Sequence, residues 1–217
     1  MSARPTSICV AADTVALRCT EERGLEVLLV RRRNEPFKGG WALPGGFVDD
    51  DEDLPRAAAR ELAEETGLEP VLMEQVGAWG TPGRDPRGRT VSVVYLALAA
   101  VGRDAVQGGD DAAEAAWHAV SSLPPLAFDH GDIVPAALER LRCRCERTHM
   151  ALAFLPESFR AEDLARVLGA LGCAGARTGA ERLLGVACVK TLSDGRLRVN
   201  AAEPATPLRE PVFLFHP

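Results

Sequence analysis

The sequence predicts an α/β protein in which one strand-rich layer carries a helix on each side, and a smaller domain of two helices and a β-ribbon follows. Two observations indicate this organisation. Over residues 1–145, short apolar runs of strand character are combined with two segments of helical periodicity. From about residue 146 the order changes to two helical segments followed by alternating apolar residues. We therefore expect two domains, residues 1–145 and residues 146–217.

The strands expected in the first domain are short runs rich in aliphatic and aromatic residues. Their positions are residues 8–17, 27–30, 41–43, 73–79, 91–100 and 117–120. A polar turn at residues 19–24 separates the first two, and a Gly/Pro-rich loop at residues 80–88 precedes the long fifth run. After the last strand, residues 132–142 repeat apolar side chains at helical spacing and predict a helix.

An earlier helix is predicted at residues 54–66. Pro55 is tolerated only in a first helical turn, and Gly67 is a natural helix stop. Apolar residues recur at every fourth position and form the stripe expected to be buried, namely Leu54, Ala58 and Leu62. This helix therefore has one face available for the core and another for polar chemistry.

Three glutamates on the adjoining face predict a cation site. Glu61, Glu64 and Glu65 follow at i, i+3 and i+4, where like charges repel unless a counter-charge is bound. Carboxylate oxygens are hard ligands that suit Mg²⁺ or Mn²⁺, and such an ion takes further ligands from water and substrate phosphates. Gly45 and Gly46 precede the helix and allow the backbone to approach a ligand closely.

Residues 46–68, GFVDDDEDLPRAAARELAEETGL, resemble the Nudix box at every defined position. The resemblance implies an α/β/α sandwich. It also implies metal-dependent hydrolysis of the diphosphate in a nucleoside diphosphate linked to another moiety, with ADP-ribose as the leading substrate. The three glutamates match the metal ligands of the family. We expect Arg60 to orient them by pairing with Glu52 or with the ligands themselves, because anionic metal ligands need such support.

Substrate contacts are expected from the arginines, glycines and tryptophan around the box. They are Arg31, Arg33, Trp41, Gly45, Gly46, Arg84 and Arg87. A guanidinium group matches phosphate geometry, and an indole can stack on adenine. Each role has a structural alternative, which is a salt-bridged loop for the arginines and the core for the tryptophan.

The general base is left open by the sequence. Nudix enzymes take it either from the box or from a later loop, and that loop here offers Asp110, Asp111 and Glu114. These acids follow the long strand in a stretch expected to be flexible. They are either base candidates or part of a solvated acidic loop.

The second domain has a winged-helix outline. Helices are expected at residues 164–171 and 178–190, the second opened by a capping-box pattern of Thr178 and Glu181. A turn at residues 193–195 then leads into a strand that can pair with residues 212–215. The basic residues available for DNA contacts are Arg177, Arg182 and Lys190.

The segments DPRGR, LPPLAFDH and FLPESFRAEDL extend the resemblance to Nudix-related transcriptional regulators of NAD metabolism. In those proteins an ADP-ribose-sensing Nudix domain is joined to a DNA-binding winged helix. Residues 146–217, however, carry 9 basic and 8 acidic side chains, and DNA binding consumes many basic groups. Hydrolysis is therefore favoured over DNA binding. An ADP-ribose-responsive regulator is the alternative function, and a nucleotide-binding pseudoenzyme is a weaker one.

Composition sets the remaining expectations. The net charge is −6, and residues 1–145 carry 16 basic and 23 acidic side chains, which disfavours a general affinity for nucleic acid. Six scattered cysteines show no Cys-x-x-Cys pair, and no run approaches the length of a membrane span. We expect a cytoplasmic protein with reduced thiols and no membrane partner. The family resemblance adds the expectation of a homodimer.

Overall fold

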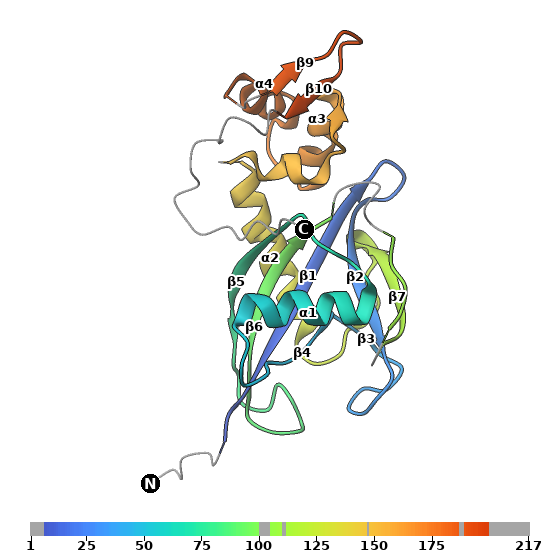
Figure 1. Ribbon diagram of the computed structural model, residues 1–217, viewed down its shortest axis with the longest axis vertical. Coiled ribbons are helices and arrows are strands. Elements are labelled where there is room, and N and C mark those ends of the chain that lie inside the picture. Colours follow the sequence, from blue (N-terminus) through green and yellow to red (C-terminus); the bar gives the residue numbers. More distant parts are fainter. Residues whose placement is uncertain (1–6, 100–104, 110–111, 147, 187–188, 200–217) are drawn as a thin grey trace.

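The structure is a computed structural model that describes residues 7–99, 105–109, 112–146, 148–186 and 189–199. Within these ranges, one mixed sheet of seven strands carries a helix on each face, and a smaller group of helices with a three-stranded sheet follows (Figure 1). The predicted α/β/α sandwich with a smaller C-terminal part is confirmed.

The main sheet is built around a parallel pair of long strands, with antiparallel neighbours on both sides. Its strands are β1 (Cys9–Thr20), β2 (Gly24–Arg32), β3 (Trp41–Ala42), β4 (Gly45–Phe47), β5 (Leu72–Trp79), β6 (Thr90–Leu98) and β7 (Ala112–Ala119). β1 runs parallel to β6 along most of its length. At its other edge β1 has two partners: it pairs with β4 over residues 11–13 and with β2 over residues 17–20.

Helix α1 (Leu54–Thr66) covers one face of the sheet, with the predicted bounds. The Asp53 side chain caps it by accepting a 3.1 Å hydrogen bond from the amide of Arg56. Gly67 ends it in the left-handed conformation at φ 69°, which glycine adopts without strain. Buried small and aliphatic side chains seat the helix on the sheet: Ala57, Ala58 and Leu62.

Helix α2 (His130–Cys145) covers the opposite face, behind the sheet in Figure 1, and extends the predicted helix at both ends. A short 3-10 turn, η1 (Val120–Ser122), follows β7 before the chain reaches this helix. The buried stripe of α2 is Ile133, Val134, Ala137 and Leu141. An apolar helix of membrane-crossing length is absent from all of the described ranges.

The C-terminal part packs onto the same apolar cluster as α2. Its elements are η2 (His149–Phe154), β8 (Ser158–Phe159), α3 (Ala161–Ala170), α4 (Ala176–Val186), β9 (Val189–Thr191) and β10 (Leu197–Val199). Phe154, Leu164 and Leu168 are buried in this cluster together with side chains of the sheet. One apolar cluster therefore contains side chains of the sheet, of α2 and of the C-terminal part.

Other element boundaries also differ from those predicted. The helix expected at residues 178–190 runs from Ala176 to Val186, and Lys190 lies in β9, paired with Arg198 of β10. The turn with Gly195 at φ 79° closes this hairpin, so strand pairing withdraws residues 189–191 from the helix. The other expected strand partner, residues 212–215, lies outside the described residues. β7 begins at Ala112, five residues before the predicted strand.

Candidate active site

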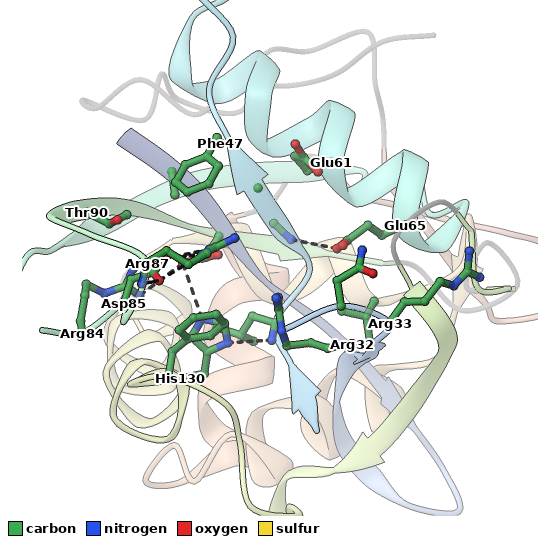
Figure 2. Close-up of a pocket in the computed structure, with 18 of the residues that line it drawn as sticks. Arg32, Arg33, Phe47, Glu61, Glu65, Arg84, Asp85, Arg87, Thr90 and His130 are labelled. Atoms are coloured by element: carbon green, nitrogen blue, oxygen red, sulfur yellow. Dashed lines mark hydrogen bonds and ion pairs between the residues drawn. The ribbon is translucent and has the colours of Figure 1, made fainter. Parts of the chain in front are cut away.

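A pocket of about 380 Å³ lies beside α1 and β4. Three carboxylates of α1 line it: Glu61, Glu64 and Glu65. Four guanidinium groups line it from the end of β2 and the loop between β5 and β6: Arg32, Arg33, Arg84 and Arg87. In Figure 2 the labelled glutamates of α1 lie above the arginines. An anionic wall opposite a cationic wall suits a phosphate ligand that is bound through a cation on one side and guanidinium groups on the other.

Arg60 organises the anionic wall. Its Nε and Nη2 donate to the two carboxylate oxygens of Glu52 at 3.0 and 2.5 Å. Its Nη1 donates to Glu61 at 2.8 Å and to Glu64 at 3.1 Å. These carboxylates, that of Glu52 first, raise the pKa of Arg60 further above its ordinary value. The predicted pairing of Arg60 with Glu52 and with glutamates of the box is confirmed, and it holds these carboxylates around one guanidinium group.

Glu65 is turned away from Arg60, toward the backbone of β4. Its Oε2 accepts a 3.0 Å hydrogen bond from the amide of Gly45. Burial raises the pKa of Glu65 to about 8, and the nearby charges of Glu61 and Asp13 add to the rise. Burial also raises the pKa of Glu61, against the opposing effect of Arg60. Both acids are therefore in surroundings that favour a bound proton or a bound cation.

The two glycines of β4 are required by close approaches. A side chain on Gly45 would lie 2.5 Å from the carbonyl oxygen of Ala12 and 2.5 Å from Oδ1 of Asp13. A side chain on Gly46 would collide with the carboxylate of Glu61. Glycine thus lets β4 lie between β1 and the glutamates of α1.

The carboxylates of α1 have the donor chemistry of a divalent-metal site. They present hard oxygen ligands in one pocket, which suits Mg²⁺ or Mn²⁺. Within the described ranges, however, no three His, Cys, Asp or Glu side chains are arranged as a ligand set. Arg60 holds Glu61 and Glu64, and Gly45 holds Glu65. Each of these bonds uses one oxygen of its carboxylate, so the second oxygen can ligate an ion once the three side chains move closer together, while Arg60 and Gly45 stay in place.

A buried charge network in the wall of the pocket joins Arg84, which the sequence analysis named, to Asp13 and Asp129, which it missed. Arg84 donates to both carboxylate oxygens of Asp129, at 2.9 and 2.6 Å, and lies 3.5 Å from Oδ2 of Asp13. Ser92 donates a 2.5 Å hydrogen bond to the same oxygen of Asp13. Burial acts to raise the pKa of Asp13, but its contacts with His130, Ser92 and Arg84 hold it below the ordinary value. A single aspartate within the apolar run of β1 was the available signal.

His130 joins this network to the start of α2. Its Nδ1 accepts a 2.9 Å hydrogen bond from the amide of Leu43, and its Nε2 lies 3.7 Å from Oδ2 of Asp13. Because Nδ1 is an acceptor, a neutral imidazole carries its proton on Nε2, facing the aspartate. His130 thereby connects the loop before β4, strand β1 and helix α2 at the floor of the pocket.

Arg87 and Arg33 contribute to the cationic wall in different ways. The guanidinium group of Arg87 binds the buried carboxylate of Asp85 through Nε at 3.1 Å and Nη2 at 2.7 Å. Nη2 of Arg33 donates to the carbonyl oxygen of Ala112 at 2.9 Å, at the start of β7. Arg32, the arginine between the two assigned from sequence, also lines the pocket.

Other residues proposed from the sequence lie outside the lining of this pocket. Arg31 donates to the carbonyl oxygen of Gly39 at 3.2 Å and lies 3.7 Å from the carboxylate of Glu114. Trp41 packs edge-on against His118, with 4.5 Å between ring centroids. Asp110 and Asp111 lie outside the described residues.

The proposed DNA contacts are exposed on the C-terminal part. Arg177 and Arg182 lie on α4, and Lys190 lies on β9. Nη2 of Arg182 donates to the carbonyl oxygen of Glu146 at 2.8 Å, just after α2. Thus one of the three is already engaged by the backbone.

Comparison with known proteins identifies relatives. A NUDIX domain model matches residues 10–137. Over 113 residues the chain is 45% identical to an ADP-ribose pyrophosphatase of Methanocaldococcus jannaschii, covering 52% of this chain and 66% of the relative. Over 158 residues it is 35% identical to the ADPR responsive transcriptional repressor NtrR of Acinetobacter baylyi, covering 70% of this chain and 62% of the relative. The matches span less than two thirds of the length of these curated relatives.

The similarity in three dimensions extends over both parts of the chain. The crystal structure of NrtR from Shewanella oneidensis matches with a TM-score of 0.77 at 28% identity, covering 91% of this chain and 96% of that one. The domain model covers more than half of the sequence, including all of the box on α1. The chain belongs to the NUDIX domain family.

Proposed function

We propose that this protein hydrolyses the diphosphate bond of a nucleoside diphosphate linked to another moiety, with ADP-ribose as the leading substrate. The observation that carries the proposal is the pocket in which the glutamates of α1 lie opposite several guanidinium groups. The 45% identity to an ADP-ribose pyrophosphatase over 113 residues supports the choice of substrate.

In this proposal Glu61, Glu64 and Glu65 hold Mg²⁺ or Mn²⁺. When bound, the ion supplies a water of lowered pKa and neutralises charge on the phosphoryl oxygens. Arg60 keeps the carboxylates of the box oriented while it remains paired with Glu52. The base is either a glutamate of the box or one of the later acids Asp110, Asp111 and Glu114, of which Glu114 lies on β7.

The cationic wall binds the substrate phosphates. Arg33 and Arg87 have exposed or half-buried side chains in the pocket, and a guanidinium fork can contact two phosphate oxygens at once. Arg84 has a side chain only 4% exposed and is paired with Asp129, so we assign it to shaping the pocket floor. Gly45 and Gly46 place the backbone of β4 beside the same ligand.

The test is hydrolysis of ADP-ribose, measured as released phosphomonoester, with Mg²⁺, with Mn²⁺ and with EDTA. We expect activity only with a divalent ion, and a loss of about a hundredfold or more in Glu64→Gln and Glu65→Gln, the scale expected when a group that positions charge in the transition state is removed. Glu69→Gln is the matched control, because Glu69 is exposed and does not line the pocket. Retained activity in both box variants would contradict the assignment.

A second candidate function is an ADP-ribose-responsive transcriptional regulator. The similarity to the Acinetobacter repressor over 70% of this chain favours it. The few basic residues near α4 speak against tight DNA binding, since each phosphate contact needs a donor. The experiment is recovery of promoter fragments from the source genome near physiological salt, with and without ADP-ribose. We expect no specific fragment, and a single fragment released by ADP-ribose would make the regulator the primary function.

We also propose a homodimer, on the basis of the family resemblance. Light scattering at micromolar concentration should give twice the mass of the 23.2 kDa chain. A monomeric mass under these conditions would contradict this assembly.

A further inference from the structure

Phe47 is an apolar residue whose side chain lies outside the hydrophobic core. Phe47 lies on β4 and lines the pocket, and 40% of its surface is exposed to solvent. It belongs to none of the three apolar clusters formed by the described residues. A large exposed ring in the wall of a polar pocket is more informative than one scattered over a surface, because pockets that bind small molecules combine aromatic surfaces with a few polar groups.

The ring of Phe47 is backed by a fixed flat group. The guanidinium carbon of Arg87 lies 4.7 Å from the centroid of the Phe47 ring. Asp85, whose side chain is 2% exposed, holds that guanidinium group through Nε and Nη2. Because the carboxylate takes the edge of the guanidinium group, a face is left for the ring. In Figure 2, Arg87 lies between Phe47 and His130.

The stack continues beyond Arg87. The same guanidinium carbon is 5.8 Å from the centroid of the Phe128 ring, and Arg32 approaches that ring at 4.9 Å. Rings and guanidinium groups therefore alternate along this wall of the pocket. Such a series presents flat, polarisable surfaces of the kind on which nucleobases stack.

The position of Phe47 along β4 relates this surface to the proposed chemistry. The preceding residue, Gly46, lies against the carboxylate of Glu61. The carbonyl oxygen of Phe47 itself accepts a 3.3 Å hydrogen bond from Nη2 of Arg60. Adjacent residues of one short strand thus border the carboxylates and carry the exposed ring. A ligand whose diphosphate binds at the glutamates therefore lies next to the strand that carries Phe47.

We propose that Phe47, backed by Arg87 and Phe128, is the stacking surface for the nucleobase of the substrate. This inference rests on the proposed hydrolase function and adds where the base binds. It predicts that Phe47 contributes to affinity for a ligand that carries a base and contributes nothing to affinity for the phosphorylated sugar alone. If Phe47 only shielded the ion pair of Arg87 and Asp85, both ligands would be affected equally.

The test compares AMP with ribose 5-phosphate, which share a sugar phosphate and differ in the base. Binding of each is measured by calorimetry to the wild type, Phe47→Ala and Phe47→Trp. In Phe47→Ala the Kd of AMP should rise about tenfold or more, the scale of one lost base stack, while that of ribose 5-phosphate stays within about twofold. In Phe47→Trp, which keeps a stacking surface, AMP should bind about as in the wild type.

Phe37→Ala is the matched control. Phe37 is also an exposed phenylalanine, at 45%, and its ring contacts that of Phe128 edge-on, but it does not line the pocket. This variant should bind both ligands like the wild type. Equal weakening of AMP and ribose 5-phosphate in Phe47→Ala, or no change in either, would overturn the proposal.

Kinetics separate this inference from the proposed function. With ADP-ribose as substrate, Phe47→Ala should raise KM about tenfold and leave kcat within about twofold, since a base stack is made equally in the ground and transition states. A wild type that binds AMP through Phe47 but hydrolyses no nucleoside diphosphate derivative would refute the hydrolase alone. A wild type that hydrolyses ADP-ribose with a KM insensitive to Phe47→Ala would refute the stacking surface alone.

Discussion

The carboxylate of Glu61 lies against the α-carbon of Gly46, so closely that a methyl group at position 46 would collide with Oε1 of Glu61. These two residues are the first glycine and a glutamate of the box, separated in sequence by residues 47–60, which include the first half of α1. Their spacing in the sequence therefore corresponds to a contact in the structure. A larger residue at position 46 would therefore displace the carboxylate of Glu61.

Gly46→Ala should lower hydrolysis without unfolding the protein. The added methyl group meets the far end of a flexible side chain, so Glu61 can move aside at little cost in stability. The displaced carboxylate should reduce kcat by about 10- to 100-fold, the scale of a misplaced catalytic group. The measurements are kcat and the thermal midpoint. Gly88→Ala, where a side chain would meet no atom within 4 Å, is the control and should match the wild type in both.

Arg60→Lys should weaken metal binding although it keeps the charge. Arg60 spans Glu52, Glu61 and Glu64 with separate nitrogens, and a single ammonium group cannot reproduce this fork. We expect the apparent Kd for Mn²⁺ to rise about 10- to 100-fold, as is usual when a residue that orients metal ligands is lost. Titration followed by electron paramagnetic resonance reports this directly. An unchanged affinity would show that Arg60 does not orient the ligands.

Gly109→Ala should reduce both stability and activity. The amide of Gly109 donates to the carbonyl oxygen of Glu65 at 3.1 Å, and the amide of Gln107 donates to that of Thr66 at 3.1 Å, so this loop caps the end of α1. A side chain on Gly109 would collide with the carbonyl oxygen of Glu64, which cannot rotate away. We expect a lower thermal midpoint together with lower kcat. Loss of activity at an unchanged midpoint would contradict this account.

The raised pKa of Glu65 predicts a pH dependence of stability in the metal-free protein. Its pKa is about 8 in the folded state against an ordinary 4.5, so between these values the folded state holds a proton that the unfolded state has lost. The free energy of unfolding in EDTA should therefore fall as pH rises from about 4.5 to about 8, by an amount on the order of a few kcal/mol.

Urea denaturation across this pH range, compared between the wild type and Glu65→Gln, measures the effect. The glutamine removes the titration and still offers an oxygen to the amide of Gly45, so the variant should lack this part of the decline. Gly88→Ala, which changes no titratable group and meets no atom within 4 Å, is the control and should show the same decline as the wild type. Parallel curves for the wild type and Glu65→Gln would refute the assignment.

The sequence predicted well those helices and strands whose ends and buried faces are set by residues close to them in sequence. The bounds of α1 follow from the Asp53 cap, the early proline and Gly67, all within one stretch of chain. The apolar runs of β1 and β6 likewise marked long buried strands. β7 was recognised only from Trp117, because the alanines before it carry no strand preference and pairing with β2 decides their conformation.

The candidate active site was likewise predictable only in the part that lies in one stretch of sequence. Sequence alone indicated the box on α1, its carboxylate chemistry and the pairing of Arg60 with Glu52. It named Arg31 and not Arg32 as a substrate contact, whereas Arg32 lines the pocket and Arg31 does not. Successive strand residues point to opposite faces, and the pairing of β2 with β7 is irregular between these two positions, so their directions depend on that partner.

The sequence by itself determined the family, the fold class and the donor set of α1, because each is encoded by residue types at short, fixed spacings. Only the tertiary structure decided that Arg84 is bound by Asp129, that Asp13 lines the pocket, and that Phe47 is exposed beside Arg87. Hydrogen bonds and charge interactions depend on distances of a few ångströms in space. The partners of these side chains come from distant parts of the chain, so folding had to bring them together before their roles were defined.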